Sequence, residues 1–195
     1  MLITFPSLVF AAKKSATKTI NYKAAAYGGA KQPHHQGDMM KFQELWNNHP
    51  TVDSFIDDAP CKINGNKAFE NQCAIRMGEA LSKSGVNLSS FKGAKCWHKH
   101  SPSHILRAEE LANWLTTPFS PVNKIEKFEG VNGFQKISRK KGIIFFKDYY
   151  GPGNQGDHID LWNGSRLTRY SSWFEFSIRG GQRYADATVW FWPVL

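Results

Sequence analysis

The pattern of apolar residues changes at Pro121, and this change limits the folds open to the chain. Before it, three segments carry apolar residues at helical spacing: 39–48, 71–85 and 107–115. After it, β-branched and aromatic runs are separated by Gly, Pro and Asn, as is typical of antiparallel strands: 142–150, 157–164, 172–180 and 187–194. Helices and strands in separate blocks predict an α+β fold, with the N-terminal helices packed on one side of a mainly antiparallel C-terminal sheet.

The 195 residues suit a single domain with an extension. Residues 13–38 are rich in Lys, Ala and Gly and show no sustained period, so we expect a partly flexible N-terminal extension over 1–38 and the compact domain over 39–195. No run approaches the roughly 18 apolar residues of a membrane-spanning helix, so we expect no membrane insertion.

The chain is strongly basic, with 25 Lys and Arg against 16 Asp and Glu and a net charge of +9. Such a charge favours polyanionic surroundings through long-range attraction. Nucleic acid and an anionic cell envelope both present repeated negative groups to Lys and Arg. Charge therefore leaves the partner open, and the choice depends on a site.

Cys73 lies where the second predicted helix begins. Asn71 can cap that helix, and Gly85 can end it with a positive φ. In the first turn, unpaired backbone N–H groups and the helix dipole stabilise a thiolate and lower the pKa of the thiol. Cys73 is thus a candidate nucleophile, although a cysteine on an apolar helix face can also serve packing alone.

His158 and Asp160 occupy alternate positions of a predicted strand, so both side chains project from the same face. In isolation the segment could be a solvent-facing strand edge. Combined with Cys73, however, it matches papain-like thiol hydrolases, in which an imidazole takes the thiol proton and the thiolate attacks a carbonyl. The backbone N–H of Cys73 can then help to hold the oxyanion.

Five segments together resemble the fourth family of type VI secretion amidase effectors. They occur in order across most of the chain: 42–48 (FQELWNN), 71–78 (NQCAIRMG), 107–115 (RAEELANWL), 156–164 (GDHIDLWNG) and 189–193 (VWFWP). The NQCAIR and HIDLWNG blocks are the specific ones.

The resemblance implies a peptidoglycan amidase with an NlpC/P60, papain-like fold that cuts the bond between γ-D-glutamate and meso-diaminopimelate in stem peptides. Cys73 would be the nucleophile and His158 the general base. The effector would leave the producer cytoplasm through type VI delivery components and act in the target-cell periplasm, and a cognate immunity protein would block it. No cofactor, metal or nucleic acid is expected.

The third member of the catalytic set is less clear from the sequence. Arg169 occupies the position, about eleven residues after the histidine, where the family has an acid. Asp160 is the first choice to orient His158, although a carboxylate two residues away must bend back to reach the ring. Asp148, Asp186 or a neutral group could serve instead.

The two remaining cysteines are Cys61 and Cys96. In an oxidising periplasm they could form a disulfide that closes a loop around the helix of Cys73. Cys96 is also followed by a histidine-rich patch that includes His98 and His104. With Cys96 as its only evident partner, this patch falls short of a zinc ligand set.

Two other functions remain open from the sequence alone. One is a basic nucleic-acid-binding module, in which aromatic residues stack on bases. The other is a transglutaminase-type acyl transferase, which uses the same Cys and His pair.

Overall fold

The computed structural model of the chain describes residues 40–52, 59–98, 101, 103–122, 124–130, 133–169 and 187–195. The predicted extension over residues 1–38 and the predicted strand over 172–180 lie outside the described residues.

The three expected helices are confirmed, each shorter than its predicted range. They are α1 (Phe42–Asn47), α2 (Cys73–Lys83) and α3 (Ala108–Leu115). Gly85 follows α2 with φ +81°, as expected for a helix that ends on glycine. The predicted Asn71 cap is wrong: Gln72 occupies the N-cap position and makes no capping bond, because its side chain binds the backbone of Cys61 instead.

Four strands form one antiparallel sheet in the order β3-β6-β4-β5. Its members are β3 (Glu126–Glu129), β4 (Gly142–Tyr150), β5 (Gly156–Trp162) and β6 (Thr188–Pro193). The last three confirm predicted runs. The sequence did not indicate β3, in which Phe128 alone is buried, or the short helix α4 (Gly133–Ile137).

A small hairpin precedes α2 in the chain. It pairs β1 (Lys62–Ile63) with β2 (Asn66–Lys67). Asn64 and Gly65 connect the two strands, both with positive φ, which is the backbone conformation of a tight hairpin turn. Between β4 and β5, the short 3₁₀ helix η2 (Pro152–Asn154) makes the connection.

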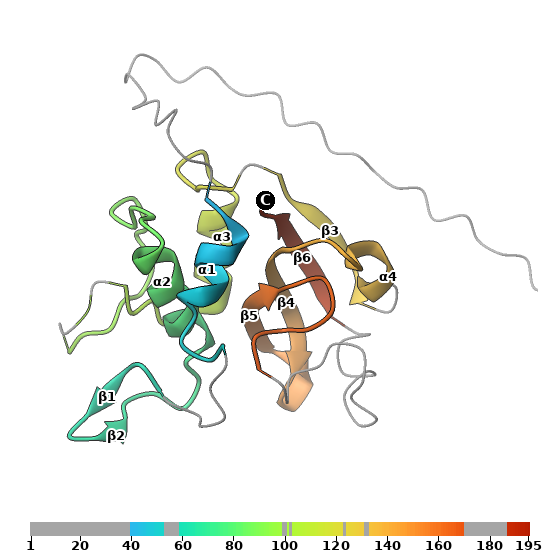
Figure 1. The fold of residues 1–195 in the computed structure, drawn as a ribbon. Helices are drawn as coiled ribbons and strands as arrows, with labels where there is room; N and C mark the ends of the chain where they lie inside the picture. Colours follow the sequence, from blue (N-terminus) through green and yellow to red (C-terminus); the bar gives the residue numbers. More distant parts are fainter. Residues whose placement is uncertain are drawn as a thin grey trace, which may run out of the picture. The chain divides into compact units, whose positions relative to one another are not determined.

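Both faces of the sheet are buried. One face packs against α1, α2 and α3, which lie together beside the sheet in Figure 1, and includes Ile143, Phe145, Ile159 and Leu161. The other face includes Phe146, Trp162 and Phe191 and is covered in part by Ile137 of α4. The prediction that the N-terminal helices pack on one side of the sheet is therefore confirmed, and α4, which was not predicted, covers part of the other face.

Helix α2 is in contact with strand β5, which places its first residue beside the edge of the sheet. On another side, Gly78 of α2 lies against the chain at Ser103, where a Cβ atom on Gly78 would come within 2.1 Å of the Ser103 carbonyl oxygen. The absence of a side chain at Gly78 thus sets how closely α2 approaches this segment. Among the described residues, none of the helices combines the length and the apolar character needed to cross a membrane.

Candidate active site

Cys73 is the first residue of α2, and its partly exposed thiol forms a hydrogen bond with the side chain of His158. Backbone N–H groups of Ala74 and Ile159 also point to the sulfur. Burial by itself raises the pKa of this thiol. The bond to His158, the charge of His158 and the two N–H groups together outweigh burial, so the pKa of Cys73 is lowered from its ordinary value.

His158 extends from β5, where its ring stacks on Phe146 with an interplanar angle of 14°. Its Nε2 lies 3.3 Å from Oδ2 of Asp160, which leaves Nδ1 to face the sulfur of Cys73. Burial lowers the pKa of His158, but the bonds to Asp160 and Cys73 and their negative charges raise it to about 10. His158 is therefore protonated at neutral pH, and its positive charge favours the thiolate form of Cys73.

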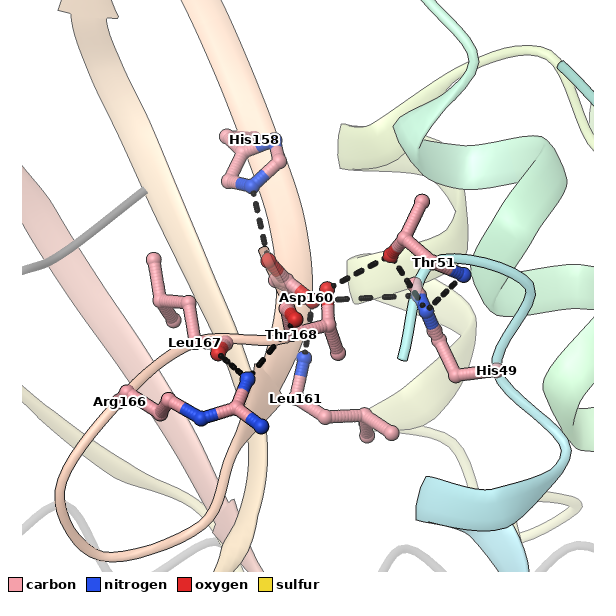
Figure 2. Close-up of polar contacts among 8 residues, drawn as sticks. All are labelled: His49, Thr51, His158, Asp160, Leu161, Arg166, Leu167 and Thr168. Atoms are coloured by element: carbon pink, nitrogen blue, oxygen red, sulfur yellow. Dashed lines mark hydrogen bonds and ion pairs between the residues drawn. The ribbon is translucent and has the colours of Figure 1, made fainter. Parts of the chain in front are cut away.

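Asp160 is buried and receives hydrogen bonds on both carboxylate oxygens. Oδ1 accepts from the Thr168 hydroxyl at 2.6 Å and from the Leu161 backbone N–H at 2.7 Å, while Oδ2 faces His158. Burial raises the pKa of Asp160, yet the bond to His158, the positive charge of His158 and the bond from Thr168 lower it overall. A carboxylate two residues from the histidine thus reaches its ring, as Figure 2 shows.

A second buried histidine lies on the other side of Asp160. Nε2 of His49 is 3.8 Å from Oδ1 of Asp160. Burial lowers the pKa of His49 to about 4, despite the attraction of Asp160, and the positive charge of Arg76 acts in the same direction as burial. His49 is therefore neutral at pH 7. Its Nδ1 lies 3.0 Å from the hydroxyl oxygen of Thr51 and 3.4 Å from the Thr51 backbone nitrogen, so one ring nitrogen faces Thr51 and the other faces Asp160.

Thr51 and Thr168 connect these groups. The Thr51 hydroxyl donates to Oγ1 of Thr168 at 3.0 Å, and Thr168 donates in turn to Asp160. Arg166 holds the backbone near Thr168, because its Nη1 donates to the carbonyl oxygens of Leu167 and Thr168 at 3.1 and 2.9 Å. Figure 2 shows the resulting arrangement, with Asp160 between His158 and the residues His49 and Thr51 of the segment that follows α1.

The structure brings together Cys73, His158 and Asp160 and assigns the contact with the ring to Asp160. Asp148 lies at an irregularity of β4, where its backbone N–H donates to Asp157, and Asp186 lies outside the described residues. Sequence patterns did not point to His49, Thr51 or Thr168 as part of the site. They are polar residues in connecting segments, and burial around one carboxylate is what gives them a role.

Cys61 and Cys96 are buried, and their sulfur atoms lie 3.7 Å apart, which is longer than an S–S bond. Burial and the neighbouring Cys96 raise the pKa of Cys61 to about 11. The predicted disulfide is therefore not formed here, and the pairing stays a prediction.

A thiol at the start of a helix, bonded to a histidine on an antiparallel strand, places the chain in the class of papain-like cysteine hydrolases. Residues 69–192 match the family model of the type VI secretion system amidase effector protein 4, Tae4. The chain belongs to this family, and it is an amidase effector. No curated protein sequence matches the chain.

Solved structures support the same fold. The Tae4–Tai4 effector–immunity complex from Salmonella Typhimurium matches with a TM-score of 0.56 and 23% identity, over 81% of this chain and 99% of the matched one. Tae4 from Enterobacter cloacae matches with a TM-score of 0.52 and 18% identity, over 80% and 96% of the two chains. The predicted α+β, papain-like fold is confirmed.

Proposed function

We propose that this effector is a cysteine endopeptidase that hydrolyses the γ-D-glutamyl–meso-diaminopimelate bond of peptidoglycan stem peptides. In this proposal Cys73 is the nucleophile, His158 the general acid and base, and Asp160 the residue that positions His158. The observation that carries it is the continuous set of contacts from the sulfur of Cys73 through His158 to the buried Asp160 carboxylate.

The reaction begins with attack of the Cys73 thiolate on the γ-glutamyl carbonyl carbon. The oxyanion that forms accepts a hydrogen bond from the Cys73 backbone N–H, which is unpaired within the helix because it belongs to the first turn. The His158 imidazolium gives its proton to the leaving diaminopimelate amine, and a thioester remains on Cys73. The neutral imidazole then removes a proton from water, and the hydroxide attacks the thioester, which frees the glutamate carboxylate and returns the thiolate.

The Asp160 carboxylate serves this cycle by its charge and its direction. It favours the imidazolium that is present before acylation and that forms again when the thioester is hydrolysed, and it keeps Nδ1 directed at the sulfur. Since its other oxygen is held by Thr168 and Leu161, the carboxylate is fixed before substrate binds. No step of this mechanism requires a metal.

The biological setting follows from the family. We propose that type VI secretion carries the protein from the producer cytoplasm into the periplasm of a target cell. The net charge of +9 suits the carboxylate-rich, anionic envelope found there. The matched Salmonella structure is a complex with the immunity protein Tai4, and we propose that a cognate immunity protein likewise binds this chain.

The test is digestion of purified muropeptides with the wild-type protein, Cys73→Ala and His158→Ala. The wild type should release products heavier by one water in total, cut between glutamate and diaminopimelate, and both variants should lose at least about a thousandfold in kcat/KM. Ser82→Ala, on the exposed side of α2, is the matched control and should keep full activity. Joined peptides in place of hydrolysis products would indicate acyl transfer, and turnover by Cys73→Ala would overturn the proposal.

A further inference from the structure

Cys61, Cys96 and His104 form a buried cluster apart from the proposed catalytic residues. One potential ligand atom from each of the three lies within 4.8 Å of the others. Their exposed fractions are 0%, 7% and 3%. The residues come from the start of the β1 segment and from the segment between α2 and α3, so the fold, rather than a short sequence motif, brings them together.

The spacing of the cluster suits a tetrahedral metal ion. The two sulfur atoms are 3.7 Å apart. Two thiolates bound to one Zn²⁺ at about 2.3 Å and a tetrahedral angle are separated by about 3.8 Å. A ring nitrogen of His104 lies within the same small volume. Zinc is bound in proteins by this combination of thiolate and imidazole ligands.

Glu79 lies beside the imidazole of His104. Its Oε1 is 3.2 Å from Nε2 of His104, and it also accepts hydrogen bonds from the hydroxyls of Ser103 and Ser101 at 2.5 and 3.1 Å. A carboxylate held in this way fixes the orientation of the histidine ring. Carboxylates regularly orient metal-binding histidines by this contact.

We propose that Cys61, Cys96 and His104 bind one Zn²⁺ ion, with water in the fourth position. Binding deprotonates both thiols, and the two protons pass to solvent. A disulfide would use the same two sulfur atoms and would leave His104 and Glu79 without a part in the cluster. The zinc site and the disulfide exclude each other, and the contacts of all four residues favour zinc.

Zinc at this position would stabilise the start of α2. The backbone N–H of Cys61 donates to Oε1 of Gln72 at 2.9 Å, and Nε2 of Gln72 donates to the Cys61 carbonyl at 2.8 Å. Gln72 directly precedes Cys73. On the other side, the Cys96 backbone N–H donates to the carbonyl of His104 at 2.8 Å. An ion held by these ligands would join the two segments of chain, one of which is hydrogen-bonded to the residue before Cys73.

The test is the metal content of the full chain, purified without chelator and under reducing conditions. Native mass spectrometry and elemental analysis should find one zinc per chain in the wild type. Cys61→Ser, Cys96→Ser and His104→Gln should each lose most of it. The matched control is Cys73→Ser, which removes the third cysteine and should keep one zinc.

Two further measurements do not depend on the folding of the variants. Replacement of zinc by Co²⁺ in the wild type should produce thiolate-to-cobalt charge-transfer absorption, and a strong chelator should lower the Tm of the wild type. The proposal is overturned if the wild type neither contains zinc nor takes it up with sub-micromolar affinity. It is equally overturned if the purified wild type has lost two hydrogens to a Cys61–Cys96 disulfide and binds no zinc. None of these results depends on whether the chain cleaves peptidoglycan.

Discussion

The hydroxyl of Thr168 donates to Oδ1 of Asp160 across 2.6 Å, one residue before the position where the family resemblance led us to expect an acid. This segment was expected to carry the acid that contacts His158. It instead carries the hydroxyl of Thr168, which donates to Asp160, and Asp160 belongs to β5. Although Arg169 stands at the expected position, His158 still has an acid beside its ring, because Asp160 of the same strand contacts it.

Asp160→Asn should lower kcat/KM and move the alkaline limit of activity to lower pH. The substitution keeps the size of the side chain and removes the charge that raises the pKa of His158. A hydrogen bond to a charged group contributes about 1.5–3 kcal/mol, which corresponds to a shift of about one pH unit or more and to at least about a tenfold loss of rate. Full activity and an unchanged pH profile in Asp160→Asn would show that another group positions the ring.

The wild-type activity should extend over a wide range of pH around neutrality. The rate should rise with pH as Cys73 deprotonates, with a midpoint below the ordinary thiol value because the pKa of Cys73 is lowered. It should fall again as His158 loses its proton near pH 10. The measurement is kcat/KM across this range with a soluble muropeptide. A single rise with a midpoint at the ordinary thiol value of 9.0 would contradict the ion pair.

Thr168→Val should destabilise the protein and reduce activity, whereas Thr168→Ser should keep most of both. Valine removes the hydroxyl donor and leaves a buried carboxylate oxygen with one fewer hydrogen bond, which costs about 1–3 kcal/mol. Serine keeps the hydroxyl and loses only a methyl group. Urea denaturation with kinetics on both variants checks this, and equal effects of Val and Ser would assign Thr168 to packing alone.

His49→Gln should reduce the decrease in the free energy of unfolding that occurs as the pH falls from 7 to 4. The pKa of His49 is about 4 in the folded protein against an ordinary 6.5, so the unfolded chain takes up a proton first as the pH falls. The native state is then disfavoured progressively from pH 6.5 to about 4, by up to about 3 kcal/mol. The comparison is the free energy of unfolding of wild type and variant at pH 7 and pH 4. An equal loss in both would mean that His49 is protonated in the folded state.

Gly78→Ala should destabilise the protein although alanine favours helices. The gain in helix propensity is about 1 kcal/mol, but the new Cβ would meet the Ser103 carbonyl oxygen at 2.1 Å, and overpacking of this kind costs about 1–3 kcal/mol. Because α2 carries Cys73, the variant should also lose activity. Ser82→Ala on the same helix is the control and should leave the Tm within a few degrees of wild type. A stabilised Gly78→Ala would show that α2 and this segment can separate at little cost.

Local patterns in the sequence were sufficient for much of the fold. The 3.6-residue spacing of apolar side chains identified α1, α2 and α3, and aromatic and β-branched runs identified β4, β5 and β6. The same local rules placed Cys73 at a helix start and put His158 and Asp160 on one face of a strand. Elements with few buried side chains, such as β3 and α4, were missed because their periodicity is too short to detect.

The tertiary structure decided what surrounds these residues. Which acid meets His158, how Thr168 and His49 hold that acid, and how Cys61 comes to lie beside Cys96 and His104 all depend on contacts between distant segments. Such contacts leave no periodic pattern in the sequence, because the fold determines which distant residues lie beside a buried carboxylate or thiol. The sequence thus determined the elements and the reactive residue types, and only the packing of α2 and of the segment that follows α1 against β5 determined the environment in which they act.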